Sequence, residues 1–161
     1  FFQAEDGIRD TSVTGVQTCA LPISDCKVVD LFCGSGVLGL EALSRGAVSA
    51  CFVDYNMKSL VGISSLLTRL NASHKATLIN EEVLSWLEHN IGKQYDLVFL
   101  DPPFAFDNPA IYLSKVKHLV KKNGLVYLEN KSSTSITLDS EVECWRSARA
   151  GTVYYGLYRV L

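Results

Sequence analysis

The stretch KVVDLFCGSGVLGLEALSR, residues 27–45, decides the fold of this chain. It begins with an apolar run over 27–32, which is typical of a buried strand. It continues into a helical pattern over 37–45 that stops at Gly46. The stretch therefore predicts a strand, a short glycine-rich turn and a helix, which together begin an α/β domain.

Three glycines lie in the turn of this stretch. Gly34, Gly36 and Gly39 have the spacing GxGxxG. Glycines at these places permit a tight turn, the close approach of a ligand to backbone N–H groups, and close contact between helix and strand. The pattern favours a ligand that approaches the backbone of this turn, and a purely structural strand-to-helix turn is the alternative for this pattern alone.

Further apolar runs follow at regular intervals, and helical patterns fill the intervals. The later strands are expected at 48–53, 75–80, 95–100 and 124–129. The second helix is expected to start after Asn56. The fourth helix has Asn108 as its predicted N-cap, Pro109 at its first position and Asn123-Gly124 at its end. This alternation predicts a parallel sheet with helices on both faces.

The last part of the chain follows another pattern. Two strand-like segments, 142–150 and 152–161, are joined through Gly151 with no helix between them. We expect them to form a hairpin that closes one edge of the sheet antiparallel. The predicted fold class is therefore α/β, with a Rossmann-like, mostly parallel doubly wound sheet and a C-terminal antiparallel hairpin.

Residues 1–24, FFQAEDGIRDTSVTGVQTCALPIS, have no strand or helix periodicity. Back-translated, the segment resembles a read-through of a short-read sequencing adapter. Its acidic residues and its lack of an apolar run exclude a secretory or transit peptide. We interpret 1–24 as a non-native segment without a fold of its own and 25–161 as a single domain.

Charge and cysteine content narrow the possible functions. Residues 25–161 hold 14 of the 15 basic and 14 of the 17 acidic side chains, so nucleic-acid binding would need a local patch. The cysteines have no CxxC pair, we expect Cys33 to be a small buried thiol, and we expect no metal site. No apolar run could span a membrane, which favours the cytoplasm. A solvated helix face is the first interpretation, ahead of an RNA contact, for Lys115, Lys117, Lys121, Lys122 and Lys131.

An acidic residue, Asp54, follows the second predicted strand. A carboxylate there can accept hydrogen bonds from both hydroxyls of a ribose. A helix N-cap is the alternative for Asp54, although Asn56 already suits that position. Together with the glycine turn, Asp54 indicates a nucleoside-containing cofactor, and a nicotinamide cofactor would use the same acid.

The sequence VFLDPPF, residues 98–104, indicates the chemistry. Asp101, Pro102, Pro103 and Phe104 follow a buried strand at the carboxyl edge of the sheet, where open α/β sheets bind ligands. The Asp101 carboxylate and the Pro102 carbonyl can accept both N–H bonds of an exocyclic base amine, while Phe104 stacks on the base. The segment therefore predicts an amine of a nucleic-acid base as substrate.

In order, DLFCGSGVLGLEALSRGA, FVD, DPPF and ARAGTVYYGLYRV resemble the class I S-adenosyl-L-methionine-dependent methyltransferases. They are most similar to the bacterial enzymes that methylate guanine N2 in 16S ribosomal RNA. The resemblance implies that Asp30 faces the methionine ammonium and that Asp54 binds the ribose. It places an adenine contact at Glu82 and the Val83 amide, where a first-turn helix residue is an equal alternative for Glu82. The rest of its cofactor turn comprises Phe32, Gly34, Ser35, Gly36 and Gly39, and its catalytic motif is Asp101, Pro102, Pro103 and Phe104.

The resemblance also implies the partners and the product. The substrate would be ribosomal RNA or the small-subunit particle, with the target base flipped out, and we expect a monomer without a metal. Members of this family begin with a basic segment and a helix ahead of the first strand. If these are missing, we expect lower stability and poor RNA methylation. Three alternatives stay open: an adenine-N6 methyltransferase, a nicotinamide-dependent oxidoreductase and an inactive cofactor-binding fragment.

Overall fold

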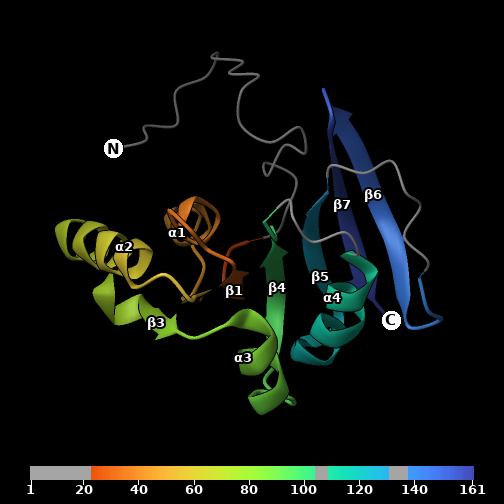
Figure 1. Ribbon diagram of the computed structural model, residues 1–161, viewed down its shortest axis with the longest axis horizontal. Helices are drawn as coiled ribbons and strands as arrows, with labels where there is room; N and C mark the ends of the chain where they lie inside the picture. The colour runs from red at the N-terminus through yellow and green to blue at the C-terminus, as the bar shows by residue number, and fades with distance from the viewer. Residues whose placement is uncertain (1–22, 104–108, 131–137) are drawn as a thin grey trace.

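The computed structural model describes residues 23–103, 109–130 and 138–161, which form one seven-stranded sheet (Figure 1). The strand order is β3-β2-β1-β4-β5-β7-β6, and the first five strands run parallel. β7 pairs antiparallel with β5 and with β6, which confirms the predicted hairpin at the edge. The strands are β1 (Lys27–Leu31), β2 (Ser49–Asp54), β3 (Ala76–Asn80), β4 (Tyr95–Leu100), β5 (Val120–Asn130), β6 (Val142–Ala150) and β7 (Val153–Val160).

Helices cover both faces of the sheet. The α-helices are α1 (Val37–Ser44), α2 (Met57–Arg69), α3 (Val83–His89) and α4 (Pro109–Val116), and the short 3-10 helices are η2 (Ser73–Lys75) and η3 (Lys117–Leu119). α1 and α2 pack on one face, while α3, α4 and η3 pack on the other. The doubly wound α/β architecture that the sequence predicts is therefore confirmed.

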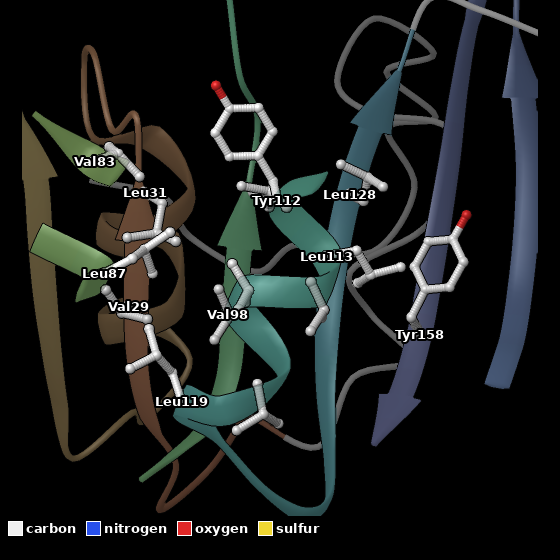
Figure 2. Close-up of a cluster of buried hydrophobic side chains, with 14 of the residues drawn as sticks. Val29, Leu31, Val83, Leu87, Val98, Tyr112, Leu113, Leu119, Leu128 and Tyr158 are labelled. Carbon is white, nitrogen blue, oxygen red and sulfur yellow. The ribbon is translucent and has the colours of Figure 1, made fainter. Parts of the chain in front are cut away.

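Each face of the sheet has its own hydrophobic core. One core lies under α3 and α4 (Figure 2). There Leu87 of α3 and Leu113 of α4 pack against side chains of β1, β4 and β5, such as Val29, Val98 and Leu128. Under α1 and α2, the core is built from aromatic and aliphatic side chains: Phe52, Phe99, Tyr127, Leu60, Ile63 and Leu67. Burial on both faces explains why the parallel strands are apolar without alternation.

The fourth helix ends earlier than predicted. The sequence places its end at Asn123-Gly124, but α4 stops at Val116 and β5 already begins at Val120. Val120 is buried and pairs with Tyr95, so strand pairing extends the sheet where the helix was expected to continue. The predicted N-cap Asn108 lies outside the described residues.

Ile23 contributes to the core, although the sequence predicts that it belongs to the non-native segment 1–24. Its side chain is 3% exposed, and its carbonyl accepts a hydrogen bond from the Cys26 N–H at 3.1 Å. The boundary at residue 25 stays a prediction. Among the described residues, no helix has the length and apolar character needed to cross a membrane.

Candidate active site

Four carboxylates lie at the carboxyl ends of four neighbouring strands. In the order of the sheet these are Asp54 at the end of β2, Asp30 in β1, Asp101 after β4 and Glu129 in β5. Adjacent strands are about 4.8 Å apart, so the row extends over about 14 Å. The sequence predicted three of these acids as site residues.

The four acids lie on one face of the sheet. Asp30 pairs with Phe52 and with Phe99, and Phe99 pairs with Tyr127. Paired residues of parallel strands share a face, and this face carries α1 and α2. The remaining acids each follow one of these aromatic residues by two positions: Asp54, Asp101 and Glu129. The row of acids therefore lies on the α1 face, at the carboxyl ends of the strands.

The glycine turn joins β1 to α1 next to this row of acids, and its conformation is compact. Phe32, Gly34 and Gly36 have φ of 57°, 49° and 76°, in the left-handed region. The Gly36 N–H donates to the Cys33 carbonyl at 2.6 Å, which closes the turn. A Cβ at Gly34 would meet no atom nearer than the Phe32 carbonyl oxygen, 3.9 Å away, and Ser35 is exposed. The backbone of this turn is therefore open to a ligand.

Gly39 lets α1 pack closely against the sheet. A Cβ at Gly39 would lie 2.3 Å from Cε1 of Phe52, and a Cβ at Gly36 would lie 2.8 Å from the Ile63 side chain. Real Cβ atoms do not approach other atoms this closely, so both positions require glycine. This confirms the close helix-to-strand contact that the GxGxxG pattern predicts.

Asp30 is a buried acid held by the first turn of α1. Its carboxylate accepts a hydrogen bond from the Gly39 N–H at 2.9 Å, and the residue is 2% exposed. Burial raises the pKa of Asp30 from 3.8 to about 8; the Gly39 N–H opposes the rise, and Asp101 and Asp54 add to it. A cation bound nearby would favour the ionised form of this group.

Asp54 joins the glycine turn to the start of α2. Its Oδ2 accepts from the Gly34 N–H and its Oδ1 accepts from the Asn56 N–H, both at 2.8 Å. Asn56 is the N-cap of α2, since its side chain accepts from the Lys58 N–H. The N-cap alternative for Asp54 is therefore wrong. Each carboxylate oxygen has a second lone pair for a ligand hydroxyl.

Asp101 is partly buried at the end of β4. Burial raises its pKa to about 6, and the neighbouring Glu129 adds to the rise. Pro102 is buried and Pro103 is exposed, while Phe104 lies outside the described residues. In the described part of the DPPF segment, a half-buried acid thus lies at the carboxyl end of β4, as predicted.

Glu82 is the N-cap of α3, because its Oε2 accepts from the Ser85 N–H at 2.9 Å. The Val83 side chain is buried in the core under α3, which leaves only its backbone to face a ligand. Burial raises the pKa of Tyr112 and the charge of Glu82 adds to it, while the Tyr112 ring meets Phe32 edge-on at 5.4 Å. Glu82 therefore holds the start of α3, and its adenine contact stays a prediction.

Glu129 and its partner Tyr127 were not predicted as site residues from the sequence. The buried Tyr127 hydroxyl donates to Oε1 of Glu129 at 2.7 Å. Glu129 is half-buried, and burial raises its pKa while the Tyr127 donation opposes the rise. The available signal was an acid at the carboxyl end of the predicted strand 124–129, directly comparable with Asp101.

The described lysines of the predicted helix face lie on three different elements, and Lys131 lies outside the described residues. Lys117 bonds Asp139 at 2.6 Å and also Glu141, while Lys115 and Lys121 pair with other acids. Lys121 and Lys122 belong to β5 and not to a helix. Ion pairing neutralises part of the positive charge expected in this region.

Comparison with known proteins agrees with this architecture. The family model described as conserved hypothetical protein 95 matches residues 5–159. Ribosomal RNA small subunit methyltransferase D of Escherichia coli strain K12 is 32% identical over 161 residues, covering 96% of this chain and 77% of the relative. The protein of the same name from Haemophilus influenzae is 33% identical over 141 residues, covering 85% and 73%.

A solved structure also resembles this chain in its fold. The crystal structure of a putative methylase from Haemophilus influenzae has a TM-score of 0.80 at 30% identity, covering 87% of this chain and 89% of that one. The strand order, the C-terminal hairpin and the matched span agree with the class I methyltransferase fold. This chain therefore belongs to the conserved hypothetical protein 95 family.

Proposed function

We propose that this protein transfers a methyl group from S-adenosyl-L-methionine to the exocyclic N2 amine of a guanine in 16S ribosomal RNA. The observation that carries the proposal is the position of Asp101. It lies between the buried Asp30 and the half-buried Glu129 at the carboxyl ends of neighbouring strands, and two prolines follow it. The two relatives named as ribosomal RNA small subunit methyltransferase D support the choice of substrate.

The residues at the glycine turn suit this cofactor. S-adenosyl-L-methionine supplies a methyl group on a sulfonium, and its sulfonium and ammonium are both cationic. The row of carboxylates provides negative charge for such a ligand, with Asp30 facing the ammonium and Asp54 accepting from the ribose hydroxyls. The open backbone at Gly34 and the exposed Ser35 border the same site. Phe32, Gly36, Gly39, Glu82 and Val83 complete the proposed cofactor residues.

Asp101 and Pro102 orient the substrate amine. A guanine amine is a weak nucleophile because its lone pair is delocalised into the ring. When the Asp101 carboxylate and the Pro102 carbonyl accept its two N–H bonds, the amine becomes pyramidal and its lone pair is free to attack. Phe104 stacks on the base, and Pro103 helps to fix the backbone. Orientation of this kind can supply about 7 to 11 kcal/mol of the barrier.

The partner is ribosomal RNA, free or in the small-subunit particle, and the target base must leave its stack to reach Asp101. The protein acts as a monomer in the cytoplasm, where this RNA is present. Since three of the lysines near α4 and β5 are paired with acids, RNA binding depends on other basic side chains or on residues outside the described ranges.

Calorimetry with S-adenosyl-L-methionine and, separately, with NADH tests the cofactor. Binding of the first ligand alone supports the proposal. Binding of NADH alone contradicts it and favours a nicotinamide-dependent enzyme. Binding of S-adenosyl-L-methionine without methyl transfer to any RNA would indicate an inactive cofactor-binding protein.

A further inference from the structure

Glu129 extends the row of carboxylates by one strand beyond Asp101. The last paired residues of β4 and β5 are Leu100 and Leu128, so Asp101 and Glu129 occupy equivalent places on neighbouring strands. Asp30 and Asp54 lie on the opposite side of Asp101. Glu129 therefore borders the substrate side of the site and is remote from the proposed cofactor residues.

The contacts of Glu129 leave it suited to accept a hydrogen bond. Tyr127 donates its only hydroxyl proton to Oε1, which fixes the direction of the carboxylate. Among the described residues, Oε2 has no hydrogen-bond partner. A half-buried acceptor of this kind stabilises a ligand that brings a donor and disfavours a ligand that brings a lone pair.

We infer that Glu129 determines the base specificity of the proposed reaction by accepting the N1–H of the target guanine. The C2 amine of guanine has N1 on its Watson–Crick side and N3 on the other side. In the proposed pose the N1 side faces β5, where Glu129 lies beside Asp101. Guanine carries a proton at N1, whereas adenine has a lone pair there and would face the carboxylate unfavourably. This inference rests on the proposed function and adds the residue that selects guanine.

The base analogue 2-aminopurine tests this assignment, because it keeps the amine at position 2 but has an unprotonated N1. The experiment compares kcat/KM for 16S ribosomal RNA carrying guanosine or 2-aminopurine ribonucleoside at the methylated position. The wild-type protein should favour guanosine at least tenfold, because an unpaired lone pair against Glu129 is costly. Equal rates, within threefold, would overturn the inference without the need for any variant.

Glu129→Gln changes the group that faces N1. The Tyr127 hydroxyl keeps the amide oxygen occupied, which turns the NH2 group toward the base, where it matches the N1 of 2-aminopurine. The ratio of guanosine to 2-aminopurine should fall at least tenfold and can invert. An unchanged ratio in a folded variant would overturn the inference.

Tyr127→Phe is the matched control. It removes the hydroxyl bound to Glu129 but leaves the carboxylate in place. Both carboxylate oxygens can then accept, so the ratio should stay within threefold of wild type. A change as large as that in Glu129→Gln would overturn the inference. A wild-type protein that forms no N2-methylguanosine contradicts the proposed function itself. N2-methylguanosine formed with an unselective ratio contradicts only the role of Glu129.

Discussion

The Asp54 carboxylate accepts a hydrogen bond from the Gly34 N–H at 2.8 Å, although the two residues are 20 positions apart. This contact fixes the glycine turn after β1 to the end of β2, on the side of the sheet where the proposed cofactor binds. The second oxygen of the same carboxylate holds the Asn56 N–H. One side chain thus sets the relative position of two loops and offers its remaining lone pairs to a ribose.

Asp54→Ala should weaken S-adenosyl-L-methionine binding about 10- to 100-fold, because hydrogen bonds to a charged group contribute about 1.5 to 3 kcal/mol. Asn56→Ala is the control. It removes the cap of α2 at a cost of about 1 kcal/mol in stability but leaves the Asp54 carboxylate in place. Calorimetry should show an affinity within threefold of wild type for this control. Equal losses in both variants would mean that Asp54 acts only on the fold.

Gly39→Ala should lower the free energy of unfolding by about 1 to 3 kcal/mol, because the new Cβ would lie 2.3 Å from the Phe52 ring. Gly62→Ala provides the comparison, since a Cβ there meets nothing within 4 Å on an exposed face of α2. That substitution should stabilise the protein by up to about 1 kcal/mol. Urea denaturation of both variants measures the difference, and a neutral Gly39→Ala would contradict the packing of α1 described above.

Asp30→Asn should change how stability depends on pH. Because the folded pKa is about 8 and the ordinary value is 3.8, the native state holds a proton between these pH values that the unfolded state has lost. Wild-type stability therefore falls as pH rises through this window, by at most about 1.4 kcal/mol per pH unit from this group. The asparagine oxygen can still accept from Gly39, so the variant should keep its fold and lose this slope.

Urea titrations of both proteins at pH 5, 6, 7 and 8 measure this effect. Asp30→Asn should become more stable than wild type as the pH rises. Parallel pH profiles would show that Asp30 is not a protonated, buried acid in the folded protein. The same variant should bind S-adenosyl-L-methionine more weakly, because it cannot supply a negative charge.

Asp101 should impose a pH dependence on methyl transfer. The ionised carboxylate accepts hydrogen bonds, whereas the protonated acid offers a donor to the amine. With a pKa of about 6, kcat/KM should be low at pH 5, rise with a midpoint near 6 and level off above 7. In Asp101→Asn the rate should fall about tenfold or more and the midpoint near 6 should disappear. The same midpoint in this variant would assign the titration to another group.

The fold could be predicted almost entirely from hydrophobic periodicity. Buried parallel strands are continuous apolar runs, and the turn glycines separate them from the helices. The error lay at residues 120–124, where local signals favoured a helix but pairing of Val120 with Tyr95 began β5. Pairing across the sheet depends on residues distant in sequence, which a local pattern does not reveal.

The candidate site could be predicted where residues belong to a compact motif. Asp30, Asp54 and Asp101 each lie at or next to the end of a recognisable strand, and the structure brings them together at the carboxyl ends of neighbouring strands. The N-cap contact of Glu82 depends on the geometry of one helix start. Glu129 had one signal, its place at the end of the predicted strand 124–129, but no motif surrounds it. Its place beside Asp101 depends on the register between β4 and β5.

Identification of the methylated nucleoside tests the central claim most directly. Unmethylated 16S ribosomal RNA and small-subunit particles are incubated with the protein and methyl-labelled S-adenosyl-L-methionine, digested to nucleosides and analysed by mass spectrometry. We predict label in N2-methylguanosine, and none when Asp101→Ala replaces the wild-type protein. Label in N6-methyladenosine, or N2-methylguanosine formed equally by the variant, would contradict the account.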